Sequence, residues 1–109
     1  HPFLGLLSEE EQRQEILEGK QDLERALGRR VRAFAFPFGH YNETTLGILE
    51  ASEFEYACTC IPQEVRLDSP ALLLPRRGVG DWDGDRLALE LEYLVRPART
   101  RLLERLHLA

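Results

Sequence analysis

The chain has 109 residues, which is the size of a single domain. Hydrophobic residues make up 43% of it and charged residues 30%, as is typical of a globular protein, while the formal net charge of −5 excludes a general nucleic-acid binder, because phosphate contacts need a basic surface. No apolar stretch approaches the roughly 18 residues of a membrane-spanning helix, and nothing in the sequence indicates a location for the protein.

The first predicted element is a helix between Ser8 and Gly28. Ser8 and Glu11 have the spacing of a capping box, in which each side chain accepts a hydrogen bond from the other residue's amide. Gly28 supplies the left-handed residue that commonly ends a helix. The helix is expected to bury one apolar stripe, formed by Ile16, Leu23 and Leu27 with the stem of Lys20.

An apolar run over Val31–Phe36 predicts a strand covered on both faces, as in a parallel sheet. Pro37 stops this strand, and Gly39 allows backbone dihedrals that other residues avoid. Asn42 can cap a following helix, whose expected buried side is Leu46, Ile48 and Leu49. Because ligands bind at the carboxyl ends of strands in α/β folds, the rigid loop between this strand and helix is a candidate oxyanion site; a plain turn is the alternative.

The remaining elements continue the alternation of strands and helices. Residues Phe54–Cys60 predict a second strand, and Leu72–Leu74 predict a short third one. Asp83 is a candidate cap for a helix through Leu87, Leu91 and Leu94. An Arg-rich helix is expected over residues 98–108. This order of elements indicates the α/β class with mostly parallel strands.

Two cysteines, Cys58 and Cys60, lie two residues apart on the second predicted strand. Their C-x-C spacing lacks the second ligand pair of a zinc knuckle, and a disulfide between them would strain the strand. We therefore interpret both as buried or half-buried thiols that act as small hydrophobic side chains, with a redox role as the alternative.

Five segments together give the chain a family resemblance. In chain order they are HPFLGLL at residues 1–7, EILEGKQDLERALG at 15–28, FAFPFG at 34–39, EYACTC at 55–60 and LPRRGVGDWDG at 74–84. They resemble the polysaccharide deacetylases of the NodB-homology family, carbohydrate esterase family 4. The resemblance implies the second half of a distorted (β/α)7 barrel of the glycoside hydrolase/deacetylase type. It places a partial deacetylase domain at residues 1–95 and the Arg-rich helix at 96–109.

The resemblance implies a hydrolase that acts on the carbon–nitrogen bonds of N-acetyl groups and uses a divalent metal, which lowers the pKa of a bound water. His1 matches the second His of the family's H-x-x-x-H pair and is the predicted metal ligand. The family's Asp-rich motif and first His would lie upstream, and the absence of Met from the chain also leads us to expect an upstream segment. Zn is the expected metal, with Co, Ni or Fe as alternatives. The alternative for His1 is a terminal residue without a role.

Pro37, Phe38 and Gly39 match the motif that shapes the family's substrate groove. The match implies that the Phe38 amide stabilises the tetrahedral oxyanion and that its ring packs along a sugar. Arg76 matches a position near the end of a later strand, where it would orient or pair with the catalytic carboxylate. Trp82 falls in a stretch that lines the groove, so it is either a sugar-stacking platform or a packing residue outside the barrel.

Two histidines depart from the family pattern. Many family members take their general acid from a late L-x-I-x-H motif, which is missing here and which His107 does not match. His40 follows the groove motif where the resemblance predicts no fixed residue. We interpret it as a solvent-exposed loop residue, with a local acid as the alternative.

These observations predict the C-terminal part of a metal-dependent deacetylase that acts on N-acetylated poly- or oligosaccharide. The isolated piece is expected to be inactive, because the catalytic Asp and most metal ligands are missing from it. It is also expected to self-associate through open sheet edges. The alternative is a non-catalytic carbohydrate-binding or scaffold domain derived from the same barrel.

Overall fold

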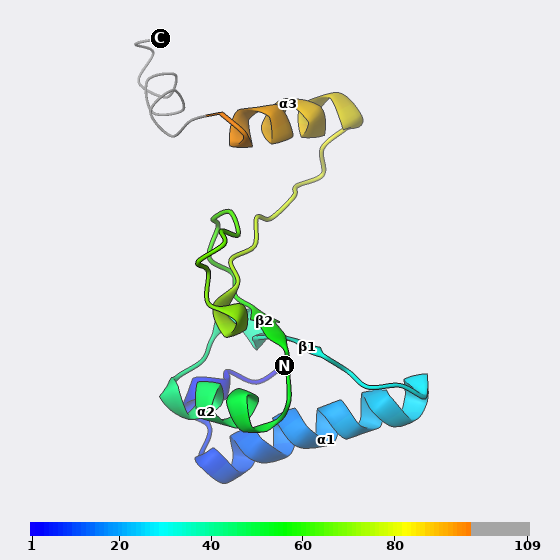
Figure 1. The fold of residues 1–109 in the computed structure, drawn as a ribbon, viewed down its shortest axis with the longest axis vertical. Coiled ribbons are helices and arrows are strands. Elements are labelled where there is room, and N and C mark those ends of the chain that lie inside the picture. The colour runs from blue at the N-terminus through cyan, green and yellow to red at the C-terminus, as the bar shows by residue number, and fades with distance from the viewer. Residues whose placement is uncertain (97–109) are drawn as a thin grey trace. The chain divides into compact units, whose positions relative to one another are not determined.

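A computed structural model of the chain describes residues 1–96 and shows short strands alternating with helices (Figure 1). In chain order the elements are α1 (Glu9–Leu27), β1 (Ala33–Ala35), α2 (Glu43–Ala51), β2 (Tyr56–Cys58) and α3 (Gly84–Leu94), with 3-10 turns at Leu4–Leu6, Pro37–Gly39 and Ala71–Leu73. The chain divides into two compact units, His1–Gly78 and a second that starts at Val79. The predicted α/β class is confirmed, whereas the helix expected over 98–108 lies outside the described residues.

The sheet of the first unit is parallel but short. Its register is Ala33↔Tyr56, Phe34↔Ala57 and Ala35↔Cys58, and Leu74 adds one parallel bridge to Cys58. Each strand pairs over three residues, fewer than the apolar runs predicted. The predicted third strand is a 3-10 turn that ends at this bridge. The Leu73 amide donates to the Pro70 carbonyl at 3.0 Å and closes this turn, so the residue that follows it, Leu74, forms the bridge to β2.

The core lies between the sheet and the helices α1 and α2, which lie beside each other below the strands in Figure 1. Phe34 and Ala57 face each other in the register and turn toward these helices, because side chains alternate along a strand. The buried hydrophobic side chains are Leu4, Ile16, Phe36, Ile48, Leu49, Phe54 and Ala57. The predicted burial of Ile48 and Leu49 is thus confirmed, and Leu46 packs against the same cluster.

Two burial predictions are wrong. Leu23 and Leu27 are 53% and 56% exposed, so the buried side of α1 is centred on Ile16 instead. The reason is length: α1 has 19 residues and α2 only 9, so the last turns of α1 run past their partner. β1 is also not covered on both faces within residues 1–96, since Ala33 and Ala35 are exposed on the side away from the core.

The predicted helix caps are present. Ser8 Oγ accepts from the Glu11 amide at 3.2 Å, and the Glu11 carboxylate accepts from the Ser8 amide at 3.4 Å. Gly28 ends α1 with a φ of +67°. Asn42 Oδ1 accepts from the Thr45 amide at 3.1 Å, and the Thr45 hydroxyl accepts from the Asn42 amide at the same distance. Each cap contributes about 1 kcal/mol to helix stability.

A buried polar network ties the two helices to the loop before α1. Gln12 donates to the Leu7 carbonyl at 3.2 Å and to Asn42 Oδ1 at 3.4 Å, and it accepts from the Thr45 hydroxyl. Among the described residues no buried side-chain nitrogen or oxygen lacks a partner, so burial leaves no donor or acceptor of this network unpaired. The network fixes where α2 sits along α1, which apolar contacts alone would specify less well.

The second unit contains α3. Asp83 accepts from the Arg86 amide at 2.8 Å, which confirms the predicted cap. Leu87 and Leu94 are half-buried and Leu91 is 55% exposed. None of the helices in residues 1–96 combines the length and apolar character that crossing a bilayer requires.

Candidate functional site

Three sequence motifs meet at the carboxyl edge of the parallel segments. β1 runs into Pro37–Gly39, β2 runs into Cys60, and the bridge residue Leu74 runs into Arg76. The segments after β2 and after Leu74 stay side by side beyond the ladder, because the Arg76 amide donates to the Ile61 carbonyl at 2.9 Å. Ligands bind at this edge in α/β folds. We call these residues, with the N-terminal segment that packs on them, the strand-end site.

The Pro37–Gly39 turn has an uncommon backbone. Phe38 and Gly39 have φ values of +57° and +69°, in the left-handed region, which costs a bulky residue such as Phe38 on the order of 1 kcal/mol. The amides of Gly39 and His40 close the turn through bonds of 2.8 and 3.0 Å. Neither bond uses the Phe38 amide. Phe38 as a residue is 63% exposed, so both its amide and its ring are candidates to meet a ligand.

Cys60 lies between the turn and Arg76. A Cβ on Gly39 would stand 2.9 Å from Cys60 Cβ, so the turn passes directly over this residue. Arg76 Nε donates to the Thr59 carbonyl at 2.9 Å, and its Nη2 lies 3.8 Å from Cys60 Sγ. The prediction for Cys60 is wrong: the side chain is exposed, because Thr59 takes the inward position at the strand end. Cys58 is half-buried, as predicted.

The segment that carries His1 packs on the turn. Phe3 stacks on Phe38 with ring centroids 4.5 Å apart and planes 21° apart, and the exposed His1 meets the same ring edge-on at 6.4 Å. Leu4 is 1% exposed and anchors the segment in the core. The fold therefore brings His1 and Phe38 together at the edge that also carries Arg76. Sequence reasoning missed Phe3, because its only signal was an aromatic residue near a terminus.

His40 is not the solvent-exposed loop residue that was predicted. It is half-buried, and its Nδ1 accepts from the Gly5 amide at 3.1 Å. Its ring also meets Phe3 at 90°, with centroids 5.4 Å apart. Because Nδ1 is an acceptor, the neutral ring carries its proton on Nε2.

Comparison with known proteins identifies the chain. The sequence model of a family described as polysaccharide deacetylase matches residues 1–57, more than half of the chain. The chain belongs to the polysaccharide deacetylase family. The matched part includes His1 and the Pro37–Gly39 turn, and it confirms the NodB-homology resemblance.

A solved structure extends this likeness beyond the family match. The deacetylase PplD of Streptococcus pyogenes, solved in complex with acetate, is 26% identical with a TM-score of 0.76. The alignment covers 89% of our chain and 42% of the PplD chain, so our chain spans less than half of that structure. No curated protein matches the sequence.

The described part of this deacetylase-family chain does not by itself form a metal site. Within residues 1–96, no group of three or more His, Cys, Asp or Glu side chains could hold a metal ion. His1 is exposed at the strand-end site, and its role as a metal ligand stays a prediction.

Trp82 of the deacetylase-family chain belongs to the second unit. The Arg86 guanidinium lies 5.2 Å from the centre of its ring, and a Cβ on Gly80 would stand 2.8 Å from its Nε1. These contacts hold the ring at the start of α3. A role of Trp82 in sugar binding stays a prediction.

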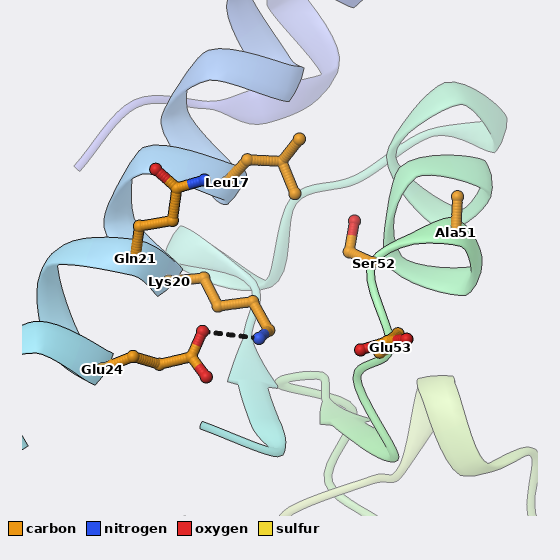
Figure 2. Close-up of a pocket in the computed structure, with 7 residues that line it drawn as sticks. All are labelled: Leu17, Lys20, Gln21, Glu24, Ala51, Ser52 and Glu53. Atoms are coloured by element: carbon orange, nitrogen blue, oxygen red, sulfur yellow. Dashed lines mark hydrogen bonds and ion pairs between the residues drawn. The ribbon is translucent and has the colours of Figure 1, made fainter. Parts of the chain in front are cut away.

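A hollow of about 260 Å³ lies between α1 and the segment that joins α2 to β2 (Figure 2). It is lined by Leu17, Lys20, Gln21, Glu24, Ala51, Ser52 and Glu53. Lys20 Nζ donates to Glu24 Oε1 at 2.7 Å, and this bond, helped by one from the Val31 amide, lowers the pKa of Glu24 against the opposing effect of desolvation. The residues that line the hollow precede β1 or β2 in the chain, whereas ligands in α/β folds bind at the carboxyl ends of strands.

Proposed function

We propose that this chain forms part of a metal-dependent deacetylase that hydrolyses N-acetyl groups on poly- or oligosaccharide. In this proposal it supplies the second half of a distorted (β/α)7 barrel. Membership of the polysaccharide deacetylase family and the likeness to PplD support it. The observation that carries it is the meeting of His1, Phe38 and Arg76 at one strand-end edge.

Amide hydrolysis needs an activated water, a donor that stabilises the oxyanion and a proton for the leaving amine. The Phe38 amide would be the oxyanion donor, because the turn fixes its direction and uses the amides of Gly39 and His40 for its own closure. A preorganised donor of this kind typically contributes about 10² to 10³ in kcat.

The metal would be Zn, or else Co, Ni or Fe, with His1 as one ligand. When bound, it would lower the pKa of a water and polarise the acetyl carbonyl. His1 suits this role because it is exposed and its ring is steadied by the edge of Phe38 rather than buried in the core.

Arg76 would hold a catalytic carboxylate from another part of the domain. Its backbone amide and Nε are already bonded, to the Ile61 and Thr59 carbonyls, so the side chain is held at the edge with its Nη groups beside Cys60. Guanidinium–carboxylate pairs are strong, and the positive charge would keep the pKa of that carboxylate low.

The ring of Phe38 would pack against a sugar, in a groove shaped by Pro37 and Gly39. Because Phe38→Ala keeps the backbone amide, it separates the two roles of this residue. We expect the variant to raise KM about tenfold, which corresponds to roughly 1.4 kcal/mol of binding energy, with kcat nearly unchanged.

The test is acetate release from chitin oligosaccharides by the full-length protein, with and without a chelator. We expect release that the chelator abolishes and added Zn or Co restores, and no release from residues 1–109 alone. Release that is indifferent to the chelator would exclude metal dependence. Oligosaccharide binding without any release would favour the non-catalytic carbohydrate-binding alternative.

A further inference from the structure

Side chains from the loop after β1 hold both peptide groups of Gly5. The Gly5 amide donates to His40 Nδ1 at 3.1 Å, and Asn42 Nδ2 donates to the Gly5 carbonyl at 3.3 Å. Asn42 is itself fixed, because it caps α2 and accepts from Gln12. The backbone of Gly5 is therefore held by two side chains, His40 at its amide and Asn42 at its carbonyl.

The contact between Gly5 and His40 is unusually close. A Cβ on Gly5 would stand 2.6 Å from His40 Cε1 and 3.0 Å from Nδ1. Only glycine lets the imidazole lie directly against the backbone in this way. Gly5 and His40 can therefore pack this closely because Gly5 has no side chain and the His40 ring is flat.

The same imidazole also reaches the aromatic stack of the strand-end site. Its ring meets Phe3 edge-on at 5.4 Å, Phe3 stacks on Phe38 at 4.5 Å, and His1 contacts the far edge of that stack at 6.4 Å. His40 therefore touches the segment that carries His1 at two points, the Gly5 backbone and the Phe3 ring. Through Phe3 it also supports the ring of Phe38.

We propose that His40 is a positioning residue, which locks the His1–Gly5 segment onto the Pro37–Gly39 turn through its Nδ1 lone pair. The inference rests on the proposed function, because the groups it positions are the proposed metal ligand and the proposed oxyanion donor. The neutral ring, with its proton on Nε2, is the form that makes the bond to Gly5. Side chains that hydrogen-bond directly to metal ligands change metal affinity or activity about 10- to 100-fold when removed, and we take this range as the upper limit for His40, which acts through Gly5 and Phe3.

The experiment compares His40→Ala with His40→Asn in the full-length protein. Asparagine places an amide oxygen near the position of Nδ1 and can accept from the Gly5 amide, whereas alanine cannot. We expect His40→Ala to lower kcat/KM for chitin oligosaccharides by up to about 10- to 100-fold and His40→Asn to restore most of it. Gly5→Ala, which pushes on the ring from the other side, should resemble His40→Ala.

Two NMR measurements test the contact without relying on activity. Nitrogen-15 spectra of His40 should show Nδ1 as the acceptor and Nε2 as the protonated nitrogen. The Gly5 amide should be protected from hydrogen exchange in the wild type and in His40→Asn but not in His40→Ala. Circular dichroism melts check that each variant is folded.

A proton on Nδ1 in the neutral ring, or an active His40→Ala variant, would overturn the inference. Equal losses in folded His40→Ala and folded His40→Asn would do the same. A wild type that releases no acetate but keeps both NMR signatures would overturn the proposed deacetylase activity. It would still support the proposed role of His40 in holding the His1–Gly5 segment on the turn.

Discussion

A side chain on Gly39 would point straight at Cys60. An alanine Cβ would stand 2.9 Å from Cys60 Cβ and 3.3 Å from its amide nitrogen, and the φ of +69° is one that alanine avoids. Because both the clash and the dihedral have to be relieved, we expect Gly39→Ala to lower the free energy of unfolding by about 1–3 kcal/mol. Urea denaturation followed by circular dichroism measures this.

The matched control for that substitution is Gly19→Ala. Gly19 lies in the middle of α1, and a Cβ there would meet nothing within 4 Å. Alanine in a helix interior is better than glycine by roughly 0.5–1 kcal/mol, so this variant should be more stable than the wild type. A Gly39→Ala variant as stable as the wild type would contradict the close passage of the turn over Cys60.

Single residues were predictable where the signal is local. The Pro-x-Gly pattern gave the turn at Pro37–Gly39, and the Gly at its end has the left-handed backbone that the pattern requires. His40 and Cys60 were misjudged because their surroundings come from elsewhere. The partner of His40 is Gly5, which lies 35 residues earlier, and no periodicity around His40 could reveal it.

At the scale of elements, helix ends were better predicted than strands. Ser8, Asn42 and Asp83 are caps whose bonds reach only three residues along the chain, so the sequence contains the whole motif. The length of a strand depends on its partner, and the burial of a helix face depends on how long the neighbouring helix is. Leu23 and Leu27 have the spacing of a buried helix face, but α2 does not extend far enough to cover them. The periodicity of α1 alone contains no information about the length of α2.

Glu24 joins the last turns of α1 to the start of β1. It accepts from Lys20 at 2.7 Å and from the Val31 amide at 3.2 Å, and the Lys20 bond is the main reason that its pKa is lowered. The unfolded chain therefore holds this proton more tightly than the folded one, so the stabilisation is present at neutral pH and is lost as the pH falls through the lowered pKa. We expect Glu24→Gln to be less stable than the wild type at pH 7 and the difference to shrink well below the ordinary Glu pKa of about 4.3.

The measurement is the urea midpoint of both proteins across this pH range, with Glu15→Gln as the control on an exposed part of the same helix. Glutamine keeps one oxygen, which can accept from the Val31 amide, and loses the charge together with the second oxygen that accepts from Lys20. A Glu24→Gln deficit that stays constant from neutral to acid pH would show that the charge of Glu24 contributes nothing through Lys20.

At the scale of the whole molecule, β1 is the open edge of the sheet within residues 1–96. Arg32 accepts from the Glu55 amide at 2.8 Å, and Phe36 donates to the Cys58 carbonyl at 3.2 Å. In a parallel ladder alternate residues bond to the same side, so the backbone groups of Ala33 and Ala35 face away from β2. Such unpaired groups accept a strand from another chain.

We therefore expect residues 1–109, made alone, to form dimers or larger species in sedimentation velocity at micromolar concentration. Ala35→Lys should shift the distribution toward monomer, because a charge beside the edge disfavours pairing. Ala26→Lys adds the same charge on an exposed part of α1 and should leave the distribution unchanged. Equal association of all three proteins would locate the contact away from β1.

The α/β fold class and the family could be predicted from the sequence, because it contains five family motifs in order and an alternation of strand and helix patterns. That Phe38 and Arg76 lie at the same edge of the sheet could be predicted from a general rule, since the carboxyl ends of parallel strands lie at one edge. The packing of Phe3 on Phe38 did not follow, because two aromatic rings 35 residues apart give no signal of contact until the chain between them is folded.

The parallel pairing that builds the strand-end site also bears on how the chain folds. Ala33 pairs with Tyr56, and Cys58 bridges to Leu74, so both pairings close short loops. Closing such loops costs entropy before the strand contacts compensate for it, and parallel pairings form more slowly than helices. During synthesis, the turn, Cys60 and Arg76 therefore come together only after residue 76 has left the ribosome, whereas α1 and α2 can form earlier.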